Sequence, residues 1–195
     1  LMRSSAASDV YKRQPPKEMT LQLLRKKVPV SVWARLIRLC LYVDNAIQPI
    51  EGINNAEDYQ QMPRLTFYAQ KVYSINDALY HYNCTNINSY TATYSPKLAE
   101  QVMLSVNLLE SFFQNKDIEY IDALNFSKAE IYVRDMVKCC RFGYKEHYCL
   151  AREKIGEMDR KYFVELPFPF KILLKLSNYY IAMIYVKLAS LFKKR

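Results

Sequence analysis

Residues 54–82 read NNAEDYQQMPRLTFYAQKVYSINDALYHY, and this stretch decides the expected architecture of the chain. The first half predicts a helix. One of the two asparagines would be its N-cap, and the acidic pair would lie in the first turn, where carboxylates interact favourably with the helix dipole. The second half predicts two strands, Val72–Ile75 and Ala78–Tyr82, with Asn76 and Asp77 as the two-residue connection of a hairpin.

Shorter elements are expected before this stretch. The pair Pro15-Pro16 interrupts regular structure, and residues 19–27 are expected to form a short helix. From Val28 to Val43 the chain is mostly apolar around Trp33, which predicts a short strand that runs into a helical turn.

Three helices are expected after the stretch. Ser95 is the predicted N-cap of the first, because Pro96 then takes the first helical position, where its missing N–H is harmless. Apolar residues recur every three or four positions and give this helix one buried face: Leu98, Val102, Val106, Leu109 and Phe113. The other two helices are expected over about residues 118–141 and 144–157, and together the three form a helical appendage.

The positive charge of the chain lies at its two ends. Of the net charge of +9, residues 1–27 carry +5 and residues 166–195 carry +6, which leaves −2 for the body of the chain. This distribution fits an anionic membrane surface better than a basic nucleic-acid groove, and no nucleic-acid motif accompanies it. We therefore expect no nucleic-acid partner.

The cysteines and histidines match no known metal-binding spacing. The five cysteines include no C-x-x-C pair, and His81 and His147 are far apart in the chain. Reduced thiols in a cytoplasmic protein are the expected state.

Three pieces in a particular order carry a family resemblance. They are PVSVWARLIR at residues 29–38, the pair Glu57-Asp58, and LYHY at residues 79–82 with Ser89 beyond it. Together they resemble the C-terminal half of the catalytic domain of family 2 glycosyltransferases. The resemblance covers about residues 19–95, and the helical remainder is similar to that of enzymes of surface-polysaccharide synthesis in Bacteroides-like bacteria. It implies an α/β fold: a partial, Rossmann-like GT-A domain that lacks its N-terminal nucleotide-binding half.

The resemblance also implies an activity. It is the inverting transfer of a sugar from a nucleotide-diphosphate donor to an acceptor hydroxyl, which needs a carboxylate to take the hydroxyl proton. Asp58 matches the general base of the family and Glu57 its supporting neighbour. The alternative is that both carboxylates only stabilise the start of a helix.

Three aromatic residues match the acceptor side of the family site: Trp33, Tyr80 and Tyr82. Core packing explains Trp33 equally well, and an aromatic wall of the core explains the two tyrosines. Ala56 stands where the family usually has Gly, which is a departure from the pattern beside the acidic pair.

The donor side is expected outside this chain. The family holds its nucleotide and a divalent ion, Mg²⁺ or Mn²⁺, through an Asp-x-Asp motif upstream of the matched segment, and the chain contains no such motif. We therefore expect the 195-residue chain to be inactive by itself.

Four segments are expected. Residues 1–14 are similar to translated sequencing-adaptor sequence, with a natural basic arm or a transit-like peptide as the alternative. Residues 15–95 are expected to form the partial catalytic domain, residues 96–165 the helical appendage, and residues 166–195 an amphipathic basic helix beside a membrane.

The last segment predicts a peripheral location on the inner face of the plasma membrane. Lys175 and Lys187 interrupt its apolar run, so an interfacial helix is expected in place of a spanning one. The aromatic residues expected at headgroup depth are Tyr179, Tyr180, Tyr185 and Phe192. An ordinary helix packed on the domain is the alternative, and a non-enzymatic helical interaction module on the membrane is the second reading of function.

Overall fold

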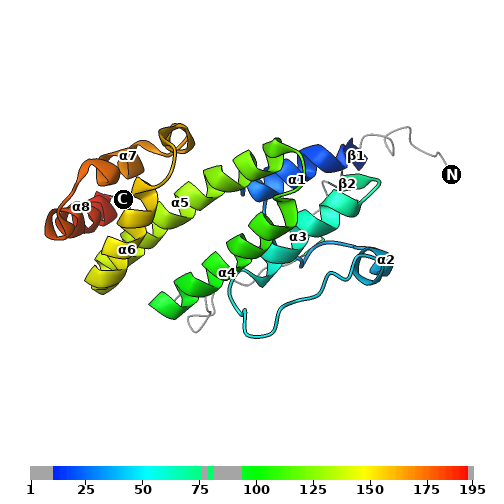
Figure 1. Ribbon diagram of the computed structural model, residues 1–195, viewed down its shortest axis with the longest axis horizontal. Helices are drawn as coiled ribbons and strands as arrows, with labels where there is room; N and C mark the ends of the chain where they lie inside the picture. Colours follow the sequence, from blue (N-terminus) through cyan, green and yellow to red (C-terminus); the bar gives the residue numbers. More distant parts are fainter. Residues whose placement is uncertain (1–10, 76–78, 81–93, 193–195) are drawn as a thin grey trace. The chain divides into compact units, whose positions relative to one another are not determined.

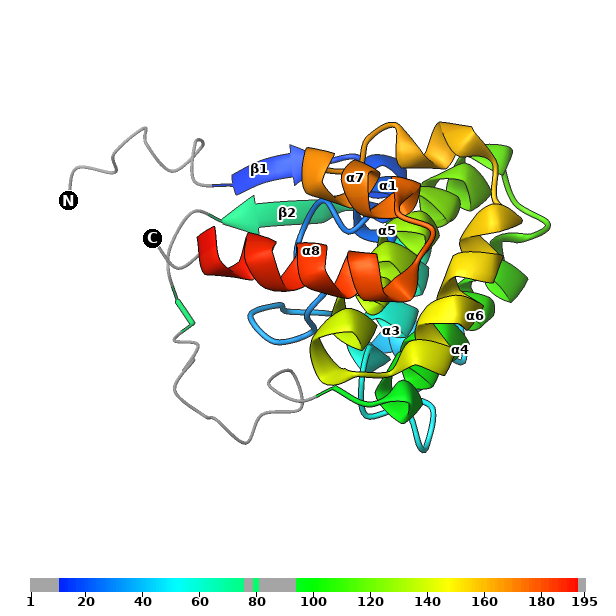
Figure 2. The same ribbon diagram turned by 90° about the vertical axis from the view of Figure 1, so that its left-hand side faces the viewer.

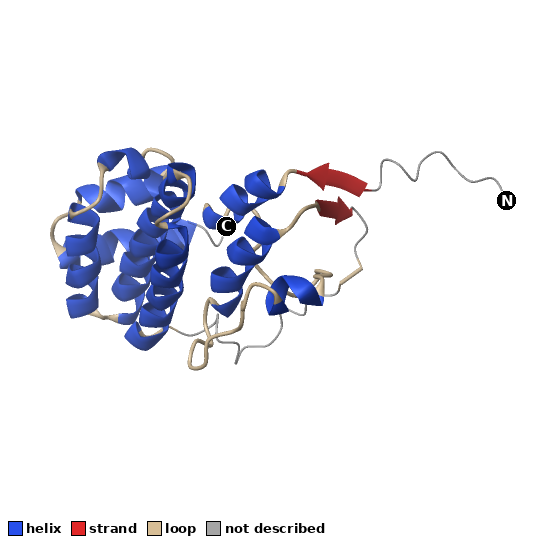
Figure 3. Cartoon of the chain, turned by 45° about the vertical axis from the view of Figure 1, so that its right-hand side comes forward, coloured by secondary structure: helices blue, strands red, loops and turns tan. Residues whose placement is uncertain are grey.

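A computed structural model describes residues 11–75, 79–80 and 94–192 (Figure 1). Most of these residues are helical, and the strands are short (Figure 3). The elements in chain order are β1 (Tyr11–Gln14), α1 (Pro16–Leu24), α2 (Leu39–Val43), α3 (Glu57–Tyr68), β2 (Val72–Ile75), α4 (Pro96–Phe113), α5 (Ile118–Phe142), α6 (Lys145–Gly156), the 3-10 helix η2 (Arg160–Phe163), α7 (Phe168–Lys175) and α8 (Tyr179–Phe192).

The predicted α/β fold is wrong. A Rossmann-like domain is built on a parallel sheet of several strands with helices on its faces. Within the described residues, β1 and β2 form a two-stranded antiparallel sheet, and helices supply the cores. Such a fold is not a GT-A domain or a recognisable part of one.

The described residues divide into two compact units. The first contains the described residues up to 80 together with 101–123, and the second contains 94–100 together with 124–192. This division differs from the expected segments, because α4 and α5 each contribute residues to both units.

In the first unit, α1 packs against α3. Their shared apolar core includes Met19, Leu23, Met62 and Leu65. A buried hydrogen bond, in which the Thr20 hydroxyl donates to the Thr66 hydroxyl at 2.9 Å, also joins the two helices. The helix α1 begins earlier than expected, at Pro16, because proline is well tolerated in the first helical turn.

The strand β2 pairs with β1, with Val72 opposite Gln14 and Ile75 opposite Tyr11 (Figure 2). Part of the expected non-native tail, residues 11–14, therefore takes part in the fold. The expected hairpin partner of β2, residues 78–82, falls largely outside the described residues.

The expected strand after Val28 is absent from the described residues 28–38. The Arg35 side chain donates hydrogen bonds to the backbone carbonyls of Pro29 and Ser31, and Ala34 has a positive φ of 61°. These features belong to a folded-back loop, because a β-strand keeps φ negative and gives its carbonyls to a neighbouring strand. The helical turn expected at its end is confirmed as α2.

The second unit has a core formed by the end of α5 with α6, α7 and α8. Its buried members include Val133, Met136, Tyr148, Leu173 and Ala182. Gly143, with φ of 87°, ends α5, and its N–H donates to the Cys139 carbonyl at 2.9 Å. A left-handed glycine at this position closes the helix and lets α6 begin two residues later.

The C-terminal segment is two helices, and the expected single helix is wrong. The Asn178 side chain accepts hydrogen bonds from the backbone N–H groups of Tyr180 and Ile181, so a new helix begins there. Tyr179, which was expected at headgroup depth, is buried in the core of the unit. Across the described helices, none combines the length and the apolar character that crossing a bilayer requires.

Two predicted helix caps have different outcomes. Ser95 is confirmed as the N-cap of α4, since its hydroxyl accepts from the Leu98 N–H at 3.4 Å. The asparagine cap of α3 is wrong: Ala56 occupies the N-cap position in a left-handed conformation with φ of 71°. The expected acids, Glu57 and Asp58, do lie in the first turn.

Candidate functional site

The first candidate site lies at the start of α3, in the first unit. The loop before this helix is held by two buried polar side chains of α4. Gln101 accepts from the Asn54 N–H at 3.2 Å and donates to the Gly52 carbonyl at 3.0 Å, and the Ser105 hydroxyl donates to the Ala56 carbonyl at 3.1 Å. These bonds fix the backbone from which Glu57 and Asp58 project.

The Asp58 carboxylate is half-buried and acts electrostatically on two nearby side chains. Burial lowers the pKa of the Arg35 guanidinium, and Asp58 partly offsets this shift. Burial raises the pKa of the Tyr42 hydroxyl, and Asp58 raises it further. The carboxylate is therefore close enough to the 28–43 segment to act electrostatically on a cation and a phenol there.

Two of the predicted acceptor-binding residues are in contact. The Trp33 and Tyr80 rings are stacked, with centroids 4.8 Å apart and an interplanar angle of 24°. Trp33 is 43% exposed and Tyr80 is 50% exposed, so neither residue belongs to the core. The core-packing alternative for these two residues is therefore wrong. Tyr82 lies outside the described residues.

The loop of residues 29–38 connects these observations. It carries Trp33, which stacks on Tyr80, and two residues later Arg35, which interacts with Asp58. An open groove of about 520 Å³ lies elsewhere in the first unit, and Asp58 does not line it. It is formed by the 50–53 loop and by the residues Leu104, Asn107, Leu108 and Ser111 of α4.

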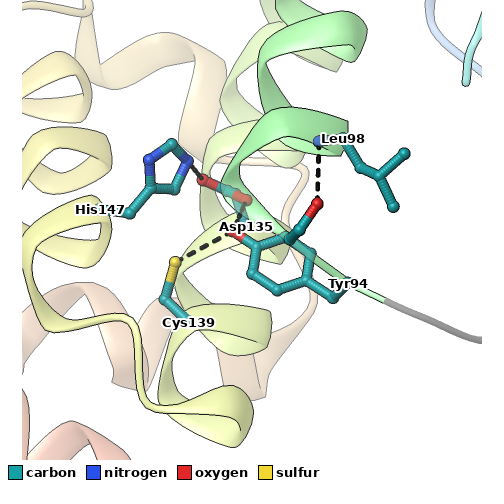
Figure 4. Close-up of polar contacts among 6 residues, drawn as sticks. Tyr94, Leu98, Asp135, Cys139 and His147 are labelled. Carbon is teal, nitrogen blue, oxygen red and sulfur yellow. Dashed lines mark hydrogen bonds and ion pairs between the residues drawn. The ribbon is translucent and has the colours of Figure 1, made fainter.

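A second group of polar side chains, which the sequence patterns missed, lies inside the second unit (Figure 4). It consists of Tyr94, Asp135, Cys139 and His147, and we call it the Asp135 cluster. His147 Nε2 lies 3.0 Å from Asp135 Oδ2, and the Tyr94 hydroxyl lies 2.5 Å from Asp135 Oδ1 and 3.1 Å from Cys139 Sγ. One metal-ligating atom from each of Asp135, Cys139 and His147 lies within 4.8 Å of the other two.

The chain folds locally so that these residues meet. Asp135 and Cys139 are four positions apart on α5 and therefore share one helix face. The turn at Gly143 reverses the chain, and His147 lies in the first turn of α6. The sequence feature that could have revealed this cluster is the spacing D-x3-C-x7-H, with a glycine between the cysteine and the histidine. This spacing matches no standard zinc motif.

The cluster is well shielded from water. The side chain of Asp135 is 11% exposed, that of His147 is 17% exposed, and Cys139 is fully buried. Burial raises the pKa of the Cys139 thiol to about 12 and also raises the pKa of Asp135, although the hydrogen bond from Tyr94 opposes the second shift. Burial thus disfavours the thiolate form that a nucleophile would need.

The Mg²⁺ or Mn²⁺ that the resemblance implies does not fit these residues. Among the described residues, the Asp135 cluster is the group of acids, cysteines and histidines close enough to share an ion. It contains a thiol, whereas those ions prefer oxygen ligands. No step is therefore assigned to such an ion.

Comparison with protein-family models, with curated proteins and with solved structures found no match to the chain. Both candidate sites are therefore inferred from the sequence and structure of this chain alone.

Proposed function

We propose that the chain supplies the acceptor side of an inverting glycosyl-transfer site, with Asp58 as the general base. One observation carries the proposal: a single loop, residues 29–38, carries Trp33, which stacks on Tyr80, and Arg35, whose charge interacts with that of Asp58. Trp33, Asp58 and Tyr80 are residues that the resemblance selects, and they lie far apart in the sequence. The proposal concerns the chemistry of these side chains and not the GT-A fold.

The chemistry assigned to the residues is a proton transfer at a sugar hydroxyl. An alcohol is a weak nucleophile, and a carboxylate within hydrogen-bond distance takes its proton as the new glycosidic bond forms. In the same step the bond from the anomeric carbon to the diphosphate oxygen of the donor breaks, and the nucleoside diphosphate leaves. Asp58 has this role, and the positive charge of Arg35 interacts favourably with its carboxylate. The exposed aromatic pair Trp33 and Tyr80 offers the flat apolar surface on which the face of a sugar ring packs. Glu57, the neighbour of Asp58 in the first turn of α3, supports the loop before that helix.

The binding half of the proposal is tested by fluorescence. Trp33 is the single tryptophan of the chain, so its emission reports directly on the proposed sugar surface. We expect glucose, galactose, mannose or N-acetylglucosamine, free or as octyl glycosides, to change this emission at millimolar concentration. The Tyr80→Ala variant should weaken the response, whereas Tyr180→Ala, an exposed tyrosine of the second unit, should not. A flat titration with every sugar contradicts the proposal.

The catalytic half is tested in a protein that also carries the donor-binding residues. There, Asp58→Asn should lower kcat by about 10²–10⁴-fold, the usual effect of losing a general base. Glu57→Gln should lower it much less. Equal losses in the two variants would favour helix stabilisation as the role of both acids. The 195-residue chain itself should neither hydrolyse nor transfer a nucleotide sugar.

A second candidate function is a helical interaction module attached to the inner membrane surface. It is favoured by the outer face of α8, where Ile181, Ile184 and Leu188 are each more than half exposed. These residues are three and four positions apart and form one apolar stripe, as in helices that lie in a membrane interface. On this reading the protein is cytoplasmic and peripheral.

Vesicle binding separates the two candidates. The full chain should sediment with vesicles of phosphatidylglycerol and phosphatidylcholine and remain in solution with phosphatidylcholine alone, because its ends are basic. Ile184→Lys should reduce binding, whereas Val164→Lys, an exposed apolar residue outside α8, should leave it unchanged. Binding that is insensitive to Ile184→Lys would reject the α8 stripe as the anchor.

A further inference from the structure

The Asp135 cluster combines three kinds of metal ligand from two helices and is largely shielded from bulk water. Cys139 and Asp135 come from α5, and His147 comes from α6. Together they offer one sulfur, one oxygen and one nitrogen, all within 4.8 Å of one another. We propose that this cluster is a zinc site, with Cys139 Sγ, Asp135 Oδ2 and His147 Nε2 as its ligands.

The distances suit a tetrahedral ion after small movements. Zinc binds nitrogen and oxygen at about 2.0–2.1 Å and sulfur at about 2.3 Å, so ligand atoms around it lie about 3.3–3.8 Å apart. His147 Nε2 and Asp135 Oδ2 are 3.0 Å apart, held together by one proton. Replacing that proton with an ion moves the two side chains apart by less than about 1 Å.

The ligand set selects the ion by charge and by softness. A thiolate, a carboxylate and a neutral imidazole carry two negative charges, which balance Zn²⁺ inside a buried site. The thiol proton of Cys139 is released to water when the sulfur binds, and the imidazole proton of His147 resides on Nδ1. Sulfur excludes Mg²⁺ and Ca²⁺, which take oxygen ligands. The Lys138 ammonium is a further charge close to Asp135 and lies 5.5 Å from the Tyr94 ring centroid.

Tyr94 has a positioning role in the site. Its hydroxyl donates to Asp135 Oδ1, the carboxylate oxygen that does not bind the ion, at 2.5 Å. Such outer-shell hydrogen bonds orient a ligand, and their loss typically lowers metal affinity by about 10–100-fold. The fourth position of the tetrahedron is left to water. Tyr94→Phe therefore tests the positioning role without removing a ligand.

Cobalt provides the test, because a tetrahedral Co²⁺ site with a thiolate has a visible d–d spectrum and a sulfur-to-metal charge-transfer band. The full chain, stripped with a chelator and kept reduced, should bind one equivalent of Co²⁺ with both features, and Zn²⁺ should displace it. Cys139→Ala should abolish the charge-transfer band. The matched controls Cys140→Ala, the buried neighbour on the same helix, and Cys149→Ala, an exposed thiol of α6, should retain it.

Further variants keep the proposal falsifiable if Cys139→Ala does not fold. Asp135→Asn and His147→Gln keep side chains of similar size, and each should weaken zinc binding by more than Tyr94→Phe while far-UV circular dichroism stays helical. Zinc should raise the Tm of the wild-type chain and leave that of His147→Gln unchanged. Absence of stoichiometric cobalt binding, or equal binding by His147→Gln and the wild type, overturns the proposal. The cluster would then be a buried hydrogen-bond network that only stabilises the α5–α6 turn.

Discussion

The indole of Trp33 stacks on the ring of Tyr80 at a centroid distance of 4.8 Å, on the surface of the first unit. The two residues are 47 positions apart in the sequence, and both lie in segments that resemble the acceptor side of family 2 glycosyltransferases. Both side chains remain exposed to solvent, so the stacked pair forms an aromatic surface.

Removing the Tyr80 ring should expose Trp33 further to solvent and lower the free energy of unfolding only slightly. An aromatic stack is worth about 0.5–1.5 kcal/mol, and an exposed pair falls at the lower end. Tyr80→Ala should therefore shift Trp33 emission to longer wavelength, while the free energy of unfolding falls by less than about 1 kcal/mol. Tyr73→Ala, an equally exposed tyrosine on β2, is the control, and an identical emission shift there would argue against the stack.

The effect of the Asp58 charge on the pKa of Tyr42 gives a second prediction. Burial raises the pKa of Tyr42, and the negative charge of Asp58 adds to the shift because it opposes formation of a phenolate. Asp58→Asn removes that charge, so the pKa of Tyr42 should move down toward its ordinary value. A pH titration followed by NMR of ¹³C-labelled tyrosine checks this, with Glu57→Gln as the control. If Asp58→Asn leaves the Tyr42 titration curve unchanged, the carboxylate lies too far from the Tyr42 hydroxyl to affect its pKa.

The loop before α3 should depend on Gln101. Its side chain bonds to both Asn54 N–H and Gly52 carbonyl, and the residue is buried. Gln101→Ala removes two hydrogen bonds to backbone groups of exposed residues, which water can then reach, and should lower the free energy of unfolding by about 0.5–1.5 kcal/mol in urea denaturation. Gln114→Ala, an exposed glutamine just after α4, should change it by less than about 0.5 kcal/mol. Comparable losses in the two variants would show that the loop is not held in this way.

The turn between α5 and α6 should depend on the left-handed backbone of Gly143. A Cβ at this position meets nothing within 4 Å, so the effect of a substitution is conformational and not steric. With φ of 87°, Gly143→Ala should lower the free energy of unfolding by about 1–2 kcal/mol. It should also weaken zinc binding, because the turn aligns His147 with Cys139.

The matched control for that turn is Gly156→Ala at the end of α6. This glycine also has open space around it, and its φ is not in the left-handed region. Alanine is favoured over glycine in a helix, so the variant should be neutral or stabilising by up to about 1 kcal/mol. A stability loss as large as that of Gly143→Ala would contradict the conformational explanation.

Local signals in the sequence predicted many of the helices. The Ser95-Pro96 pair marks the start of α4, and apolar residues at helical spacing follow it, because capping and amphipathic periodicity are short-range effects. The second and third expected helices correspond to α5 and α6 within a few residues. The break at Asn178 was missed, since an asparagine within an apolar run looks like an interruption and not like a cap.

The sequence by itself determined the helices α4, α5 and α6 and the uneven distribution of charge, because capping, periodicity and composition are local properties. Only the tertiary structure decided the fold class and the pairing of β2 with β1, because strand pairing is a long-range interaction that four-residue strands do not encode locally. The Asp135 cluster also required the tertiary structure. Its four residues come from three segments, and only the turn at Gly143 and the packing of Tyr94 against α5 bring their polar atoms together.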